Sequence, residues 1–256
     1  MTFEGKLLAE KILKELKVTN HHPGLAVVLV GEDPVSLSYV QKKEEIAQNL
    51  GVVFKLYHLA GFSSQEEVEK LICDLNENKF IQGIVIQLPL PNGFEVDKIL
   101  QTINPQKDID GFSGIYPAPT VQAILELLDF YRIDVEGKKI VIVGHGRLVG
   151  KPLEVVLQKQ GVKPIICNSK TENLSQITAS ADILISATGV AGIIKPEMVS
   201  KEAIVIDAGS SEVSGHILGD VEKKVYEKVK SYSPVPGGVG PVTVAILMRN
   251  LFKAKE

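Results

Sequence analysis

Cysteine is scarce in this sequence and tryptophan is absent. Among 256 residues only Cys73 and Cys167 are cysteines, and neither belongs to a Cys-x-x-Cys motif or a Cys/His cluster. Disulfide frameworks and zinc sites both need such groupings. We therefore expect neither a disulfide nor a metal site, and we expect both cysteines to be buried apolar residues.

The sequence also lacks an excess of charge and long apolar runs. Its 28 lysine and arginine residues nearly balance 31 aspartate and glutamate residues, for a net charge of −3. No basic cluster of the kind that binds nucleic acid is present. Apolar runs such as residues 25–30 have strand length, far below the roughly 18–20 residues of a membrane span. Residues 1–18 mix charged and apolar positions, unlike a secretion signal. We expect no nucleic-acid partner, no membrane partner and a cytoplasmic location.

Helix and strand patterns alternate along the chain. Apolar spacing predicts helices over residues 3–18, 35–50 and 64–78, and strands over 24–31, 52–59 and 81–87. A second series has strands over 138–144, 162–168, 182–189 and 203–209, a helix over 148–160 and a short helix near Glu172. Helices are also expected over 118–132, between the two series, and over 239–254. This alternation predicts an α/β fold with parallel sheets in two lobes.

A glycine-rich turn, GHGRLVGKP at residues 144–152, directly follows the strand KKIVIV. Glycines permit a tight turn, and backbone N–H groups at the start of the next helix can bind a pyrophosphate. The GxGxxxG spacing is one residue longer than the commonest dinucleotide-binding fingerprint. The alternative is that these glycines only turn the chain between a strand and a helix.

The end of the strand at residues 162–168 bears on the choice of cofactor. Dinucleotide-binding folds that select NAD usually carry an acidic residue here, whereas this chain has Asn168, Ser169 and Lys170. Ser169 can donate a hydrogen bond to a 2′-phosphate, and Lys170 and Arg147 supply positive charge. We predict NADP, with NAD possible if both cations are only solvated surface residues.

Three other stretches carry candidate catalytic residues. Tyr39 and Lys43 are four positions apart on a predicted helix and so share a face, and lysine exchanges protons near neutral pH once desolvated. A Tyr-xxx-Lys pair also occurs in short-chain dehydrogenases, but there the glycine loop precedes the pair. Gln87 ends a strand, where an amide can orient a lysine without adding charge or simply bind loop backbone.

Asp108 and Asp110 flank Ile109, which puts both carboxylates on one side of an extended segment. Such a pair suits a metal ion or a nitrogen-rich ring, and the lack of further ligands disfavours the metal.

Residues 234–243 combine three prolines and three glycines immediately before a helix. So rigid a loop suits a backbone held close to a ligand.

Taken together, these segments resemble the bifunctional methylenetetrahydrofolate dehydrogenase/methenyltetrahydrofolate cyclohydrolase family over nearly the whole chain. The most specific matches are SYVQKKEEIAQNLGV, GIVIQLPLP, KDIDGF, the GxxxxVGxP core of the glycine-rich turn, and PVPGGVGPVTVA. The resemblance implies a folate and catalytic domain at residues 1–133, which the C-terminal helix at 239–256 rejoins. It implies a Rossmann-like dinucleotide-binding domain at residues 134–238.

The resemblance also implies roles for individual residues. Lys43 falls on the catalytic lysine, Tyr39 on the aromatic residue that stacks on folate, Gln87 on the glutamine that positions the lysine, and Asp110 on the carboxylate that binds the pterin. Leu88, Pro236, Gly237 and Gly238 are further expected to contact the substrate. The residues expected to bind the cofactor are Gly144, His145, Gly146, Arg147, Val149, Gly150, Ser169, Lys170, Thr188 and Gly189.

The implied activity has two steps on one folate. A hydride leaves 5,10-methylenetetrahydrofolate for NADP, and water then opens the methenyl product to 10-formyltetrahydrofolate with proton transfers at Lys43. The implied enzyme is a homodimer of one-carbon metabolism. A shikimate-dehydrogenase-like NADP oxidoreductase, a dehydrogenase without hydrolase activity and a non-catalytic folate or dinucleotide binder are the alternatives.

Three positions depart from the family pattern. Gly146 stands where family members commonly have Ser, and His145 where they often have Arg, so contacts to the phosphate end of the cofactor are expected to differ. The stretch after KDIDGF is contracted and places Val121 where a proline is usual. We therefore expect a different wall of the folate pocket.

Overall fold

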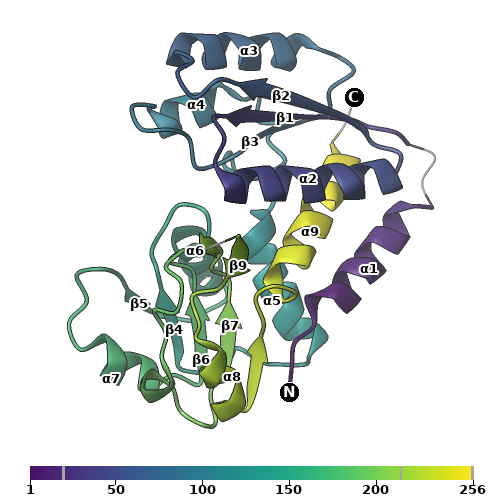
Figure 1. Cartoon of the computed structure of the whole chain (residues 1–256). Coiled ribbons are helices and arrows are strands. Elements are labelled where there is room, and N and C mark those ends of the chain that lie inside the picture. Colours follow the sequence, from purple (N-terminus) through teal and green to yellow (C-terminus); the bar gives the residue numbers. More distant parts are fainter. Residues whose placement is uncertain (19–20, 214, 255–256) are drawn as a thin grey trace. The chain divides into compact units, whose positions relative to one another are not determined.

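The protein is described by a computed structural model covering residues 1–18, 21–213 and 215–254. It divides into two compact units, which are described separately (Figure 1). The three-stranded unit comprises Glu10–Pro119 and Val244–Glu256, and the five-stranded unit comprises Met1–Ala9 and Thr120–Thr243. Within the described ranges, no helix has both the length and the apolar character needed to cross a membrane.

The three-stranded unit is built on a parallel sheet with the order β2-β1-β3. Its strands are β1 (Gly24–Val30), β2 (Val53–Leu59) and β3 (Gly83–Ile86), and its complete helices are α2 (Pro34–Asn49), α3 (Gln65–Glu77) and α4 (Val96–Thr102). The division between the units falls within α1 (Gly5–Leu16) and α9 (Val239–Lys253). All seven residues of β1 are buried, as expected for a central strand covered on both faces.

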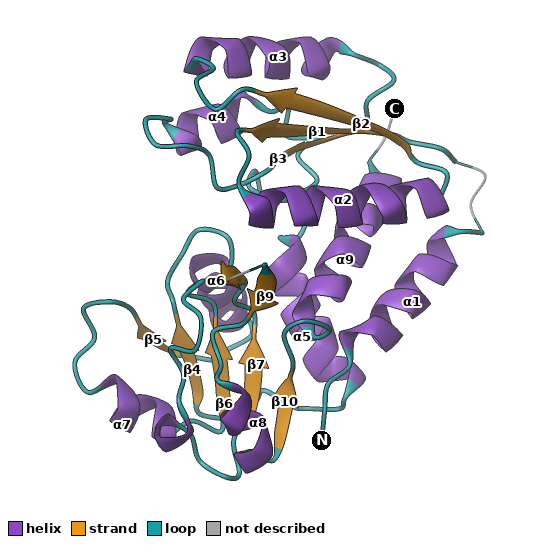
Figure 2. Cartoon of the chain, in the orientation of Figure 1, coloured by secondary structure: helices purple, strands orange, loops and turns teal. Residues whose placement is uncertain are grey.

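Side chains of β1 alternate between two apolar cores. Leu25, Val27 and Leu29 pack with residues of α2 and α9, whereas Ala26 and Val28 pack with residues of α3 and α4. Figure 2 shows the sheet between α2 and α3. The strand period of two therefore places helices on both faces of this sheet.

Side-chain caps fix where α2 and α3 begin. The Asp33 carboxylate accepts a hydrogen bond from the Ser36 N–H at 2.8 Å, and Pro34 occupies the first turn of α2. Ser64 and Glu67 form a capping box at the start of α3. The cap at Asp33 matters for the site because α2 carries Tyr39 and Lys43.

The five-stranded unit is a parallel sheet with the order β10-β7-β6-β4-β5. The strands are β4 (Ile140–Val143), β5 (Ile165–Cys167), β6 (Ile183–Ser186), β7 (Ile204–Asp207) and β10 (Ser231–Ser233). The helices are α5 (Pro119–Phe130), α6 (Gly150–Lys159), α7 (Leu174–Ala179), the 3-10 helix η1 (Pro196–Met198) and α8 (Lys223–Lys228). A two-stranded antiparallel hairpin, β8 (Ser211–Val213) and β9 (His216–Leu218), follows β7.

The predicted α/β fold with parallel sheets is confirmed, and some details differ. Sequence patterns missed the hairpin at β8 and β9, the strand β10 and the short helices α4, α8 and η1. The helix expected near Glu172 begins at Leu174. Cys167 is buried as expected, but Cys73 is exposed because it lies on the outer face of α3, so that prediction was wrong. The predicted domain boundaries at residues 133 and 238 stay predictions, and the compact units change over after Pro119 and Thr243.

Asn250 on α9 holds the segment that carries Asp110. Its buried Nδ2 donates to the carbonyl oxygens of Ile109 at 2.9 Å and Pro117 at 3.0 Å. Asn250→Ala leaves both carbonyls without this donor, so we expect a loss of about 1–3 kcal/mol in the free energy of unfolding. Urea denaturation measures it, with Asn49→Ala, an exposed position at the end of α2, as the control. Equal midpoints for the two variants would contradict the expectation.

Candidate functional site

The carboxyl edge of the three-stranded sheet has the geometry of a ligand site. The chain runs from central β1 to β2 on one side and later to β3 on the other. Open parallel sheets bind ligands outside the carboxyl ends of the strands where the order reverses, here β1 and β3. Helix α2 follows β1, and Gln87 follows β3, so both elements supply side chains to this edge.

Lys43 and Gln87 meet at this edge. The Lys43 Nζ donates to Gln87 Oε1 at 2.8 Å, and Gln87 Nε2 donates to the carbonyl oxygen of Leu88 at 2.9 Å. Gln87 is buried and Lys43 is half-buried. The amide is thus held by its own chain and presents a neutral acceptor to the amine.

The charge state of the amine is set by its surroundings. Burial lowers the pKa of the Lys43 amine below its usual value, and the Asp110 carboxylate opposes that shift. Burial raises the pKa of Asp110 to about 6, against the opposing effect of Lys43 and with a further upward contribution from Asp108. At neutral pH, Asp110 is therefore ionised beside an amine that releases its proton more readily than an exposed lysine does.

Asp108 and Asp110, expected to act as a pair, differ in their interaction partners. Asp108 is buried, and its Oδ2 accepts a hydrogen bond from the Ser113 N–H at 2.5 Å, which closes the turn after the strand edge. Asp110 is half-buried and interacts electrostatically with Lys43. One Asp108 oxygen therefore binds the backbone of its own turn, and recognition of one ligand by both carboxylates stays a prediction.

Tyr39 lies one turn before Lys43 on α2 and is half-buried. The Lys42 Nζ lies 5.6 Å from the centre of its ring. The structure therefore brings Lys43, Gln87 and Asp110 together and places Tyr39 on the helix that carries the lysine. Among the residues that the structure describes, no group of three or more His, Cys, Asp or Glu side chains is arranged to hold a metal ion.

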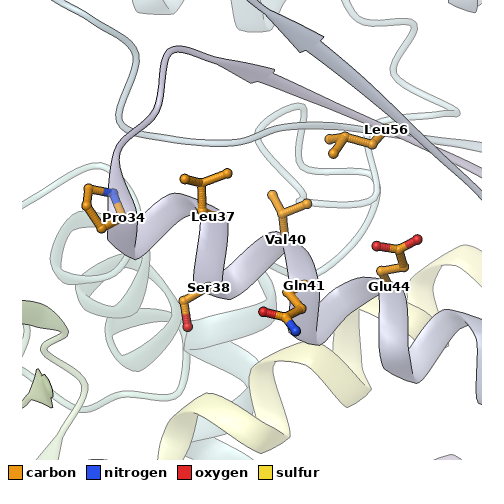
Figure 3. A pocket seen from close by; sticks show the side chains of 7 residues that line it. All are labelled: Pro34, Leu37, Ser38, Val40, Gln41, Glu44 and Leu56. Atoms are coloured by element: carbon orange, nitrogen blue, oxygen red, sulfur yellow. The ribbon is translucent and has the colours of Figure 1, made fainter. Parts of the chain in front are cut away.

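A pocket of about 470 Å³ lies elsewhere on α2 (Figure 3). Its lining residues are Pro34, Leu37, Ser38, Val40, Gln41, Glu44 and Leu56. They come from α2 and β2 and include neither Lys43 nor Gln87. The pocket is therefore separate from the candidate catalytic residues Lys43 and Gln87, although both belong to the three-stranded unit.

The five-stranded sheet repeats the strand reversal at its own carboxyl edge. Central β4 is followed by β5 on one side and by β6 on the other, so the expected ligand position is outside the ends of β4 and β6. The turn after β4 begins at Gly144, which has φ of 97°. A Cβ at Gly144 would overlap the Ala187 carbonyl oxygen after β6, and a Cβ at Gly150 would overlap the Gly144 carbonyl oxygen.

This edge fits a dinucleotide. The glycines let two turns and the start of α6 approach more closely than larger residues allow, and a helix start offers N–H groups to a phosphate. Gly144, His145, Gly146, Arg147, Val149 and Gly150 belong to the turn after β4 and to the start of α6, Ser169 and Lys170 follow β5, and Thr188 and Gly189 follow β6. The structure therefore gathers these ten residues at one edge of one unit.

His145 has a partner that sequence reasoning missed. Its Nε2 lies 2.7 Å from Glu154 Oε2 on α6, and both side chains are half-buried. The nine-residue separation spans the turn and the first helical residues, so no local spacing rule indicates the pair. Ser169 and Lys170 are exposed, and the Lys170 N–H donates to Asn168 Oδ1 at 2.9 Å.

Pro236, Gly237 and Gly238 lie in the five-stranded unit, not in the unit of Lys43. The Gly5 N–H donates to the Gly237 carbonyl oxygen at 2.9 Å, and the Gly238 N–H donates to the Pro234 carbonyl oxygen at 2.8 Å. A Cβ at Gly5 would overlap the Gly238 carbonyl oxygen. This loop is thus packed closely against the beginning of α1.

The chain matches two family models that together span most of its length. Residues 3–110 match the catalytic domain of tetrahydrofolate dehydrogenase/cyclohydrolase, and residues 118–256 match its NAD(P)-binding domain. The chain is 39% identical to the bifunctional protein FolD of Halothermothrix orenii, over 99% of this chain and 97% of that protein.

Solved structures give the same result. The bifunctional enzyme FolD from Campylobacter jejuni is 37% identical, with a TM-score of 0.92 over 99% of this chain and 98% of that one. The Trypanosoma brucei methylenetetrahydrofolate dehydrogenase-cyclohydrolase, solved with NADP and an inhibitor, is 29% identical, with a TM-score of 0.92 over 99% and 96%. On these matches, the chain belongs to the tetrahydrofolate dehydrogenase/cyclohydrolase family.

Proposed function

We propose that Lys43, Gln87 and Asp110 form the folate site at which both reactions of this enzyme take place. The chain oxidises 5,10-methylenetetrahydrofolate to 5,10-methenyltetrahydrofolate with NADP and hydrolyses that product to 10-formyltetrahydrofolate. The observation that carries the site assignment is the 2.8 Å hydrogen bond between the Lys43 Nζ and Gln87 Oε1 at the carboxyl edge of the sheet. A residue able to exchange protons is thereby fixed where open α/β sheets bind ligands.

Lys43 is proposed to exchange the protons of the hydrolysis. A general acid or base works best when its pKa lies near the operating pH, and burial shifts the pKa of this amine downward, towards that range. Gln87 holds the amine through an uncharged oxygen, whereas a carboxylate there would favour the protonated form. The same hydrogen bond to Gln87 is proposed to hold the Lys43 amine at the site during the oxidation step.

Asp110 is proposed to bind the pterin ring, and Tyr39 to stack on it. An ionised carboxylate accepts hydrogen bonds from neighbouring N–H groups of a nitrogen-rich ring. Asp110 is also proposed to place a negative charge near the methenyl cation that hydride removal creates. Leu88 and the Pro236–Gly238 loop are the further proposed contacts to substrate, the loop because the sequence there combines prolines and glycines.

The nicotinamide of NADP accepts the hydride in the oxidation. The residues proposed to hold the cofactor, at the carboxyl edge of the five-stranded sheet, are Gly144, His145, Gly146, Arg147, Val149, Gly150, Ser169, Lys170, Thr188 and Gly189. Asn168, Ser169 and Lys170 stand at the end of β5, where folds that select NAD usually carry an acidic residue, which supports a preference for a 2′-phosphate. A cytoplasmic homodimer without nucleic-acid or membrane partners is also proposed, in keeping with the balanced charge of the chain.

Replacing Lys43 tests its role in hydrolysis. Lys43→Met removes the amine while roughly keeping side-chain volume, so we expect cyclohydrolase activity to fall by about 10²–10⁴-fold, the usual contribution of a positioned acid or base. The assay follows hydrolysis of methenyltetrahydrofolate, with Lys70→Met, an exposed position on α3, as the control. A variant that folds and hydrolyses at the wild-type rate would remove Lys43 from the mechanism.

The ionisation of Asp110 predicts a pH dependence. Because its pKa is raised to about 6, the carboxyl gains a proton as the pH falls through that value and loses its charged acceptor. We expect folate affinity to fall in the same interval. Asp110→Asn should weaken it at neutral pH by about 10- to 150-fold, equivalent to about 1.5–3 kcal/mol, and flatten the profile. Equal losses of folate and NADP affinity would instead indicate misfolding.

The His145–Glu154 pair predicts a change in cofactor preference. The Glu154 carboxylate places a negative charge next to the turn proposed to bind the phosphates, so Glu154→Gln should strengthen NADP binding relative to NAD. Dissociation constants of both cofactors measure the ratio. Glu202→Gln, an exposed position before β7 at the opposite edge of the sheet, is the control. An unchanged ratio would show that this carboxylate has no effect on phosphate recognition.

A further inference from the structure

Two buried carboxylates in the five-stranded unit take no part in the reactions proposed above. Asp207 ends β7 and Asp220 follows β9, and both are fully buried. Burial, together with the nearby Asp220 carboxylate, raises the pKa of Asp207 to about 6. Buried carboxylates are costly unless they are well hydrogen-bonded, so the donors around them indicate what the pair holds in place.

Asp220 binds the turn that follows β6. Its Oδ2 accepts from the Thr188 N–H at 2.6 Å and from the Ser186 hydroxyl at 2.8 Å, and its Oδ1 accepts from the Val190 N–H at 3.1 Å. The Asp220 side chain thus accepts hydrogen bonds from two backbone N–H groups of the turn and from the hydroxyl of Ser186, the last residue of β6. An asparagine could not replace it, because an amide has one acceptor oxygen and its NH₂ group would face N–H donors.

Asp207 in turn holds the backbone of Asp220. Its Oδ1 accepts from the Asp220 N–H at 3.1 Å, and its Oδ2 accepts from the Val221 N–H at 3.0 Å and the Tyr226 hydroxyl at 3.2 Å. A Cβ at Gly209 would overlap the Asp220 carboxylate, and one at Gly219 would overlap that of Asp207. Two glycines therefore make room for the pair, which joins the ends of β6, β7 and β9.

The turn held by Asp220 is part of the proposed cofactor edge. The ideal Cβ position at Gly144 lies only 3.0 Å from the Thr188 nitrogen, so the turn after β4 and the turn after β6 are in contact. With its Thr188 and Val190 N–H groups bound to one carboxylate, the second turn is held in a single arrangement beside the first. A ligand that binds between these turns is bound more tightly when the second turn is already ordered, because binding then does not carry the entropic cost of ordering that turn.

We propose that Asp220 is a positioning residue for the cofactor, which holds the Thr188–Val190 turn in its binding arrangement, and that Asp207 supports it by fixing the Asp220 backbone. This inference rests on the proposed function of Thr188 and Gly189 as cofactor contacts. It assigns Asp220 no contact with substrate or with the reacting atoms.

The two reactions of the enzyme separate this role from a general loss of structure. Hydrolysis of methenyltetrahydrofolate consumes no nicotinamide, so it reports on the proposed folate site without the cofactor, whereas the dehydrogenase reaction also requires the cofactor. For Asp220→Asn in the full chain we expect the KM for NADP to rise by 10-fold or more. The cyclohydrolase kcat/KM, assayed without NADP, and the KM for methylenetetrahydrofolate should stay within twofold of wild type.

Asp182→Asn is the matched control. Asp182 precedes β6 and its Oδ2 accepts from the Lys139 N–H at 2.8 Å, so this variant also weakens a carboxylate bond to backbone, but at the amino edge of the same sheet. Its KM for NADP should match that of wild type. An equal rise in both variants would mean that any carboxylate at either end of β6 has the same effect, and would overturn the proposal.

A second variant covers the case in which Asp220→Asn does not fold. Ser186→Ala removes one donor to Asp220 and leaves the carboxylate in place, and we expect it to raise the KM for NADP by two- to fivefold with hydrolysis unchanged. Wild-type KM values for NADP in the folded variants would overturn the positioning role. Failure of the wild-type enzyme itself to oxidise methylenetetrahydrofolate with NADP would instead contradict the proposed function.

Discussion

A lysine amine held by a neutral amide is the interaction on which this account of the enzyme depends. The Lys43 Nζ and Gln87 Oε1 are 2.8 Å apart, and Asp110 is the charged group that opposes the effect of burial on the amine. With a carboxylate in place of Gln87, the amine would stay protonated, and without burial its pKa would remain at the value of an exposed lysine. The site needs both conditions at once, and the fold supplies both.

The strand order explains how the fold supplies them. In each unit the first strand of the sheet is flanked by the next strand on one side and a later one on the other, so two turns meet at the carboxyl edge. In the three-stranded unit that edge gathers α2 and Gln87, and in the five-stranded unit it gathers the Gly144 turn and the Thr188 turn. The same constraint of parallel topology thus places both proposed ligand sites.

Apolar spacing along the sequence predicted most helices and strands, but it did not predict contacts between residues far apart in the sequence. The apolar run of β1 indicated a buried strand, and the segment around Lys43 indicated a helix with Tyr39 and Lys43 on one face, because apolar periodicity is a local property. The Lys43–Gln87 contact was implied by resemblance to a family, since 44 residues separate its members. Glu154 and Asp220 were missed because their partners are fixed by the packing of turns, which no spacing rule encodes. The hairpin at β8 and β9 was missed because its three-residue strands are too short to show a period.

The most direct test of this account is the pKa of Lys43 itself. Titration of the full chain with ¹³C-labelled lysine, followed by NMR and assigned with Lys43→Met, measures it beside exposed lysines such as Lys70. We predict a pKa for Lys43 below that of the exposed lysines, and a higher value in Gln87→Glu, where the neutral acceptor becomes a carboxylate. If Lys43 titrated with the exposed lysines in the wild-type enzyme, it would not be the residue that exchanges protons near neutral pH.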